Sequence, residues 1–238
     1  WPFVTILPIP NAGCGSLHRF RPLAVRHVSR TRERLRNRMH EVRPQLKQAV
    51  EHHRAGAWSQ AEVLYRDALR RDAANADALH LLGVLLHQTG RLPDAIDHLS
   101  QAVACNGTEP NFHLQLANAL VDAGRSAEAE KSFRQAIDLN SRLPDAYLNL
   151  GALLQRHDCL SEAEAVYRSA RESGIASAQV ESNLGAVLFA QKRYDEAAAC
   201  YRKAIELDPA LPQAHANLAG VYRHVGRDDD AEAGYRRA

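Results

Sequence analysis

The chain has 238 residues, of which 45% are hydrophobic and 24% are charged. That composition excludes a disordered chain, and its abundance of Ala, Leu, Arg, Glu and Gln favours helices over strands. The net charge of +2 is unevenly spread, because residues 1–41 carry eight Arg and two Glu while the remainder carries 22 Lys and Arg against 26 Asp and Glu. The mildly acidic remainder has no electrostatic footprint for nucleic acid, so we expect no nucleic-acid partner.

The cysteines indicate a reducing compartment. They lie far apart and form no Cys-x-x-Cys pair, at Cys14, Cys105, Cys159 and Cys200. This usage predicts neither a zinc site nor a disulfide framework, and it favours a cytoplasmic protein with reduced thiols. No segment has the roughly 18 uninterrupted apolar residues of a membrane helix, so we expect no membrane partner.

Residues 1–41 show no periodicity, and we expect a disordered or extraneous basic segment there. Met39 is the only methionine in the chain. We hypothesise that the native protein begins at Met39 and that residues 1–38 are upstream sequence. The alternative is a disordered basic tail that binds acidic partners.

Residues 42–238 repeat every 34 residues, with no insertion or deletion. Each repeat is numbered here from position 1 to position 34. Five repeats are complete and the sixth is partial: 42–75, 76–109, 110–143, 144–177, 178–211 and 212–238. We expect this chain to be a fragment of a larger protein, because the sixth repeat is cut off within its second helix.

Small and large residues recur at helical spacing in every repeat. Positions 20 and 27 are always Ala, and position 24 between them is large, at Tyr65, Leu99, Phe133, Tyr167, Tyr201 and Tyr235. Spacings of four and three place these residues on one helix face. Nearer the start of each repeat, position 8 is Ala or Gly, and from the second repeat on it follows a Leu at position 7. These residues predict a first helix that packs against the second.

Turn residues separate the two predicted helices of a repeat. Position 15 is Gly56, Gly90, Gly124 or Gly226, but Asp158 and Lys192 replace glycine in repeats four and five. We expect a left-handed backbone there, which ends the first helix. The second helix is predicted to be N-capped by Ser or Asp where available, at Ser59, Ser161, Asp195 and Asp229.

The pattern Leu-Gly-x-x-Leu, Ala-x-x-x-Tyr-x-x-Ala and Asp208-Pro209 resembles the tetratricopeptide repeat, over residues 42–238. The resemblance implies an all-α, right-handed superhelical solenoid of antiparallel helix pairs, whose first helices line a concave groove. It also implies that the groove holds a peptide or protein, which suits the extended surface of a solenoid.

Amide side chains recur at position 6 of the first helices, and they predict a peptide-binding face. The amides at position 6 are Gln115, Asn149, Asn183 and Asn217, and we expect His80, His87 and Asn118 to line the same face. An amide both donates and accepts hydrogen bonds, so a row of amides suits a peptide backbone. The alternative is that these amides only bond neighbouring helices. Repeats that grip chaperone tails carry Lys at position 5 and Asn at position 9, and only Asn118 matches, which argues against such a clamp.

A second resemblance concerns the parent protein. The segments Met39-His-Glu-Val-Arg-Pro and Ala78-Leu-His-Leu-Leu-Gly are similar to the repeat region of bacterial O-linked N-acetylglucosaminyltransferases. In that family such repeats precede a catalytic domain that uses a UDP-sugar, and no such domain lies in these 238 residues. We therefore expect this chain to have no enzymatic activity of its own.

No residue pattern predicts a catalytic, cofactor or metal site. The twelve histidines lack an acidic residue or cysteine at metal spacing, and no glycine-rich phosphate loop is present. Arg recurs at position 16, where we expect it to complement the end of the first helix. The sequence thus predicts a protein-binding module with no cofactor and no small-molecule substrate. The alternatives are the substrate-recognition arm of a glycosyltransferase whose catalytic domain lies outside this chain and a stand-alone scaffold.

Overall fold

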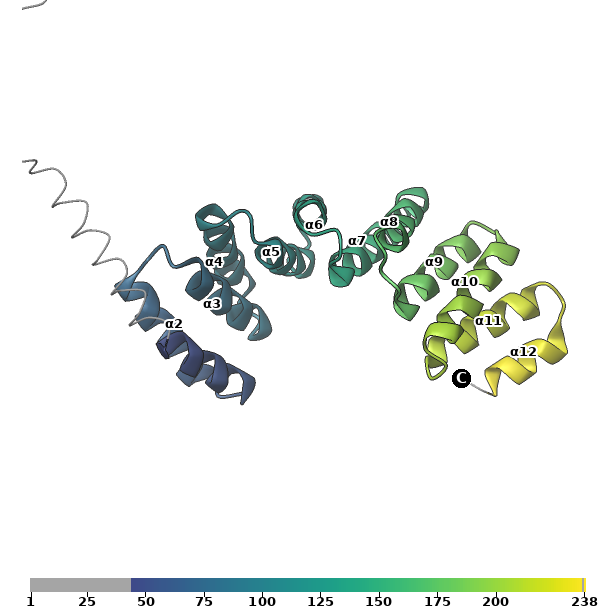
Figure 1. The fold of residues 1–238 in the computed structure, drawn as a ribbon, viewed down its shortest axis with the longest axis horizontal. Helices are drawn as coiled ribbons and strands as arrows, with labels where there is room; N and C mark the ends of the chain where they lie inside the picture. The colour runs from purple at the N-terminus through teal and green to yellow at the C-terminus, as the bar shows by residue number, and fades with distance from the viewer. Residues whose placement is uncertain (1–43, 237) are drawn as a thin grey trace, which may run out of the picture. The chain divides into compact units, whose positions relative to one another are not determined.

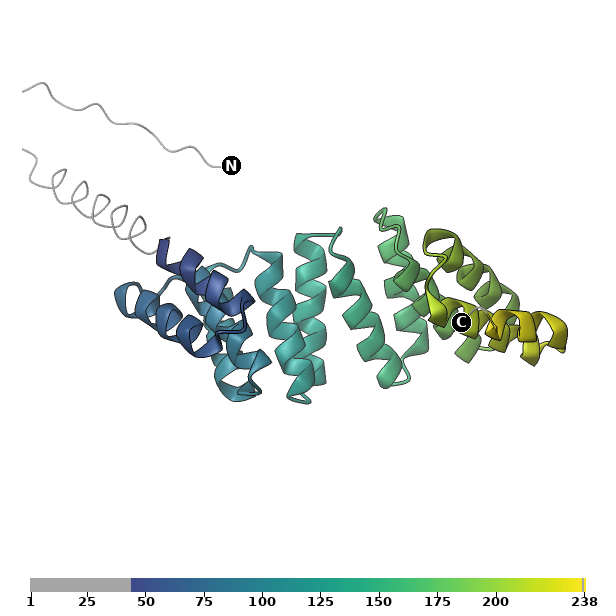
Figure 2. The same ribbon diagram turned by 90° about the horizontal axis from the view of Figure 1, so that it is seen from below.

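The computed structural model describes residues 44–236 and residue 238, which all belong to the unit Val42–Ala238. The expectations for residues 1–41, including Met39, lie outside the described residues. All regular structure in the described part is helical, which confirms the predicted all-α fold. Figures 1 and 2 show the helices following one another as antiparallel pairs.

Each repeat contributes one such pair. In the first repeat, residues 44–54 form the first helix. The later first helices are α3 (Ala76–Gln88), α5 (Pro110–Asp122), α7 (Pro144–Arg156), α9 (Ala178–Ala190) and α11 (Pro212–His224). The second helices are α2 (Trp58–Arg71), α4 (Leu92–Cys105), α6 (Ser126–Leu139), α8 (Leu160–Glu172), α10 (Tyr194–Leu207) and α12 (Asp228–Tyr235).

The stripes predicted from the period form the core. In α8, Ala163, Tyr167 and Ala170 are completely buried. Their neighbour in the first helix is Gly151, whose position leaves no room for a side chain because an added Cβ would lie 2.2 Å from Cζ of Tyr167. The small residue at position 8 therefore leaves space for the large side chain at position 24 between the two helices.

In all six repeats the turn after the first helix contains a left-handed residue at position 15, as predicted. Gly124 has a φ of +74°, and the two replacements share this conformation, with φ of 59° at Asp158 and 64° at Lys192. The amide of Lys192 donates to the carbonyl of Phe189 at 2.9 Å, which closes the helix end. The substitution of glycine in repeats four and five has therefore not changed the turn.

The predicted N-caps of the second helices are wrong. The helices begin one residue before Ser59, Ser161, Asp195 and Asp229, so these residues lie inside the first turn. The capping positions are Ala57, Cys159, Arg193 and Arg227, none of which makes a side-chain cap. Acidic residues in the first turn of α8, α10 and α12 still favour the helix start, because they oppose the positive end of the helix dipole.

The first helices lie on the inner side of the bend between neighbouring repeats. The backbone of each first helix from α3 to α9 approaches that of the next first helix, whereas the backbones of the second helices approach only first helices. Elements on the inside of a curved stack lie closer together than those on the outside. The inner side of the bend is therefore formed by α3, α5, α7, α9 and α11 (Figure 1).

Candidate functional site

All seven candidate residues lie on first helices. Two are on α3, two on α5 and one on each of α7, α9 and α11: His80, His87, Gln115, Asn118, Asn149, Asn183 and Asn217. The side of the array that carries these seven residues is called the first-helix face. They are half-buried or exposed rather than fully buried.

The structure joins two of the amides directly. The Nδ2 of Asn149 donates to Oδ1 of Asn118 at 2.8 Å, across the boundary between repeats three and four. One repeat later, Asn183 accepts a hydrogen bond from Nε2 of Gln179 at 2.9 Å and donates to the hydroxyl of Tyr167 at 3.4 Å. These contacts orient the amides and leave Asn149 exposed.

Asn217 lies in a different setting. It lines a hollow of about 510 Å³ between repeats five and six. Phe189 of α9, Tyr201 of α10, and Arg223 and His224 of α11 line the same hollow. Sequence analysis missed these four residues, because positions 12 and 13 vary from repeat to repeat and Tyr201 occupies a core position. The sequence signal that could have indicated the hollow is the difference at position 12, which is Gln155 in repeat four and Phe189 in repeat five.

The two candidate histidines are engaged within the fold. The ring of His80 stacks on Phe112 with centroids 4.7 Å apart, and its Nδ1 is buried without a hydrogen-bond partner. Burial lowers the pKa of His80 below its ordinary value of 6.5, although Asp77 and Glu109 raise it. The Nε2 of His87 lies 2.6 Å from Oδ2 of Asp122 in the next repeat.

The histidine at position 12 belongs to a link that recurs along the first-helix face. His53 bonds Gln88 at 2.8 Å, and the ring of Phe189 meets that of His224 edge to face with centroids 5.9 Å apart. In each case position 12 of one repeat contacts position 13 of the next. His87 is therefore a residue that joins two repeats as well as one that lines the face.

The recurrent arginine at position 16 is structural, for a different reason from the one expected. Arg91 donates to Glu62 of the preceding repeat at 2.6 Å, and Arg193 donates to Glu164 at 2.7 Å and to Glu196 at 2.7 Å. Glu164 is 8% exposed. Arg91 and Arg193 therefore bond carboxylates of the preceding second helix, whereas Arg125 and Arg227 pair with Glu128 and Asp230 of their own repeat.

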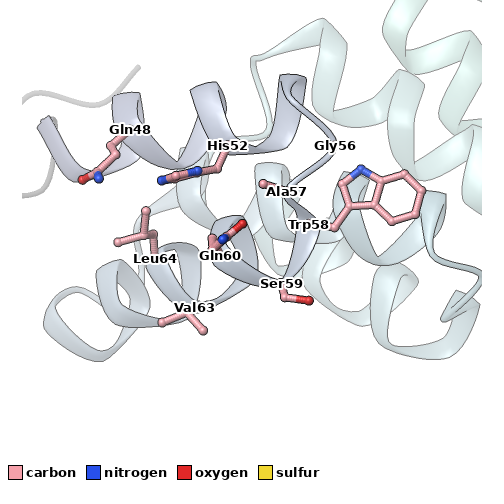
Figure 3. Close-up of a pocket in the computed structure, with 9 residues that line it drawn as sticks. All are labelled: Gln48, His52, Gly56, Ala57, Trp58, Ser59, Gln60, Val63 and Leu64. Atoms are coloured by element: carbon pink, nitrogen blue, oxygen red, sulfur yellow. The ribbon is translucent and has the colours of Figure 1, made fainter.

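A second hollow, of about 650 Å³, lies on the first repeat (Figure 3). Figure 3 shows Gln48 and His52 on the helix 44–54, Val63 on α2, and Trp58 beside the turn that joins the two helices. Trp58 is 46% exposed and Val63 is 62% exposed. The hollow therefore combines the polar Gln48 and His52 of the first helix with the exposed apolar Trp58 and Val63 of the second.

Residues 44–236 carry neither the side-chain cluster of a metal site nor an apolar helix of membrane-spanning length. No group of three or more His, Cys, Asp or Glu side chains in this part of the chain is placed to hold a metal ion. No helix in the same part is long and apolar enough to cross a membrane.

Comparisons with solved structures show the same fold in other proteins. A structure from a study of Pseudomonas aeruginosa pilF has a TM-score of 0.72 and 17% identity, over 83% of this chain and 90% of that one. A tetratricopeptide repeat protein from Parabacteroides merdae has a TM-score of 0.67 and 18% identity, over 81% and 77% of the two chains. YrrB, described as a TPR protein with an unusual peptide-binding site, has a TM-score of 0.60 and 21% identity, over 72% and 88%.

Sequence comparisons identify the repeat itself. No curated protein sequence matches the chain. A family model described as "TPR repeat" matches residues 117–158 and 185–226, and one described as "Tetratricopeptide repeat" matches residues 46–110. These segments together cover more than half of the chain, and all of them lie within the repeat region, residues 42–238. The chain belongs to the tetratricopeptide-repeat family.

Proposed function

We propose that this chain binds an extended segment of another protein along the first-helix face. The observation that carries the proposal is the recurrence of an exposed or half-buried amide at one repeat position, in Asn149, Asn183 and Asn217. Amides spaced along a groove can pair with the N–H and C=O groups of a peptide backbone whatever its side chains.

The internal contacts of these amides support the proposal. An amide has two donor hydrogens and an acceptor oxygen with two lone pairs, so the single bond between Asn149 and Asn118 leaves most of its capacity free. The bond also holds the Asn149 side chain in one orientation, which reduces the entropy lost when a ligand binds. YrrB, which shares the fold, is described as having a peptide-binding site.

The proposal is tested with peptides selected from a random library of unstructured twelve-residue sequences. The triple change Asn149, Asn183 and Asn217→Ala should weaken binding of the selected peptides about tenfold or more, since each lost hydrogen bond contributes about 0.5–1.5 kcal/mol. Dissociation constants are measured by fluorescence anisotropy, and circular dichroism checks that the helices persist.

The matched control is Gln135→Ala, which removes an exposed amide from the second helix α6. It should leave the dissociation constant unchanged. The proposal is wrong if the triple variant binds as tightly as the parent, or if the control weakens binding by the same factor.

The role of this binding in the parent protein is a separate proposal. The resemblance at Ala78–Gly90 suggests that the repeats present a polypeptide to a glycosyltransferase domain that uses a UDP-sugar. Sequencing the gene beyond codon 238 tests this. A following domain with a nucleotide-sugar-type α/β pattern would support it, whereas a polar capping helix followed by a stop codon would support a stand-alone scaffold.

A further inference from the structure

Two histidines of the second repeat bury a ring nitrogen that has no hydrogen-bond partner within the described residues. They are His80 on α3 and His98 on α4, and in each of them the atom is Nδ1. Buried polar atoms in native proteins are nearly always paired, and leaving one unpaired costs free energy. The second repeat therefore contains two rings whose protonation state matters for packing.

No other repeat has histidine at these positions, which are 5 and 23 in the repeat numbering. Position 5 is leucine in repeats three and four, at Leu114 and Leu148, and position 23 is Val166 in repeat four. Leu114 is 3% exposed and Val166 is 8% exposed. In repeat two, titratable rings thus occupy two positions that are filled by aliphatic side chains in repeat four.

His80 lies at the junction between repeats two and three. Its ring stacks on Phe112 of α5 with centroids 4.7 Å apart, and Phe112 is buried. The charged groups that act on the ring are Asp77 of its own helix and Glu109 at the start of α5, and both favour a positive charge. Burial outweighs them and lowers the pKa of His80 below 6.5, so a proton on this ring is disfavoured while the junction stays closed.

His98 responds to the junction on the other side of the same repeat. Across that junction Arg66 of α2 disfavours a positive charge on His98, whereas Asp94 and Asp97 of its own helix favour one. Burial is the largest effect, and it lowers the pKa of His98 below 6.5. Protonation would therefore bury a second positive charge near Arg66.

The buried apolar residues divide into separate clusters within repeat two. Leu82 and Leu86 of α3 cluster with the first repeat, whereas Leu99 of α4 belongs to the large cluster that continues to α11. Leu79 forms a third, smaller cluster with Phe112. From α6 to α9, by contrast, the buried apolar residues all belong to the large cluster. Repeat two is therefore a place where the apolar core of the described array is interrupted.

We propose that repeat two is an acid-sensitive joint, in which protonation of His80 and His98 loosens its packing against both neighbouring repeats. A charged ring regains its hydration only when the junction opens, because the closed junction buries it. The joint is tightest above about pH 6.5, the ordinary pKa of histidine, and loosens progressively as the pH falls below that value. No bound partner is required, so this property goes beyond the proposed function and is tested separately from it.

The test is hydrogen exchange of the whole chain, measured by mass spectrometry at about pH 7.5 and about pH 5.5, on either side of the ordinary histidine pKa. Protection factors correct for the pH dependence of the chemical exchange rate. We expect the protection of α3 and α4 to fall about tenfold at the lower pH, since one buried histidine shifts an opening equilibrium by up to about tenfold per pH unit. Helices α9 and α10 contain no histidine and should keep their protection.

The variant that removes both titrating rings takes its residues from other repeats, as His80→Leu combined with His98→Val. It should keep the protection of α3 and α4 at the lower pH. The matched control is His113→Tyr, which removes a buried histidine whose Nε2 donates to the carbonyl of Gly107 at 3.0 Å. The hydroxyl of Tyr147 makes the equivalent bond one repeat later, at 3.3 Å, so the control should fold and keep the tenfold response.

A second measurement follows the two rings directly and needs no variant that folds. NMR titration of the histidine ring signals in the parent protein should give midpoints below pH 6.5 for His80 and His98. Midpoints at or above that value for both rings would overturn the inference. Equal protection of α3 and α4 at the two pH values, an undiminished response in the double variant, or loss of the response in His113→Tyr would overturn it as well.

Discussion

Single residues at position 15 carry a conformational cost that differs between repeats. The left-handed backbone is open to glycine without penalty, whereas it costs an ordinary L-residue about 1–2 kcal/mol. Asp tolerates the left-handed region better than most L-residues, so the cost at Asp158 is smaller than the cost at Lys192. An added Cβ at Gly124 would meet no atom within 4 Å, so the cost is in the backbone and not in crowding.

Replacing Lys192 by glycine should therefore stabilise the protein. We expect Lys192→Gly to raise the free energy of unfolding by about 0.5–1 kcal/mol, which is the relieved strain less the extra entropy of glycine in the unfolded chain. Urea unfolding followed by circular dichroism measures it. As a control, Lys131→Gly within α6 should lower stability by about 1 kcal/mol. A loss of stability in both variants would contradict the explanation.

At the scale of the elements, the two helices of a repeat are fitted to each other by one small and one large residue. Gly83, Gly151 and Gly185 lie under Leu99, Tyr167 and Tyr201, and an added Cβ would lie 2.6, 2.2 and 2.7 Å from the nearest atom of the respective side chain. Repeat three solves the same problem with Ala117 beside Phe133, both buried. The size of the residue at position 8 is thus matched, within each repeat, to the size of the residue at position 24.

Adding one methyl group to this contact should destabilise the array. In Gly151→Ala the ring of Tyr167 would have to move, and that movement would break its bonds to Gln155 and Asn183. We expect a loss of about 1–3 kcal/mol in the free energy of unfolding. Gly220→Ala is the matched variant, because the nearest atom lies 3.7 Å away and the residue is inside α11.

The matched variant should change stability in the opposite direction. Alanine is favoured over glycine in a helix interior by about 1 kcal/mol, so Gly220→Ala should unfold at a higher urea concentration than the parent. If the two alanine variants shifted the midpoint in the same direction, close packing at Gly151 could not be the cause.

For the whole molecule, the sequence predicted the fold well because the same buried positions recur every 34 residues in all six repeats. Ala at positions 20 and 27 and the ring at position 24 defined the buried faces before any coordinates were known. The hollow at Asn217 could not be predicted in the same way. Phe189, Arg223 and His224 line it from positions 12 and 13, where the residues differ between repeats.

Contacts in the described array run only between neighbours along the chain. The backbone of each helix approaches the next helix, and first helices also approach the next first helix. Side-chain ion pairs such as Arg134–Glu162 and Arg168–Glu196 join consecutive second helices. Buried residues from α4 to α11 form one continuous cluster, while the first repeat and α3 form smaller ones. In such an array stability is close to a sum of repeat and interface contributions, so damage should spread only to adjacent repeats.

Hydrogen exchange measured by mass spectrometry tests this local coupling. In the parent protein, amides of α5 to α10 should exchange most slowly, and those of α12, which buries only Ala231, should exchange fastest. Introducing Gly151→Ala should speed exchange about tenfold in α7, α8 and α9 for each 1.4 kcal/mol lost, with little change in α3 and α4. If all helices lost protection equally, the described array would unfold as one cooperative unit. The bound peptide would then stabilise every repeat alike, whereas local coupling limits its effect to the repeats whose amides it contacts and to their neighbours.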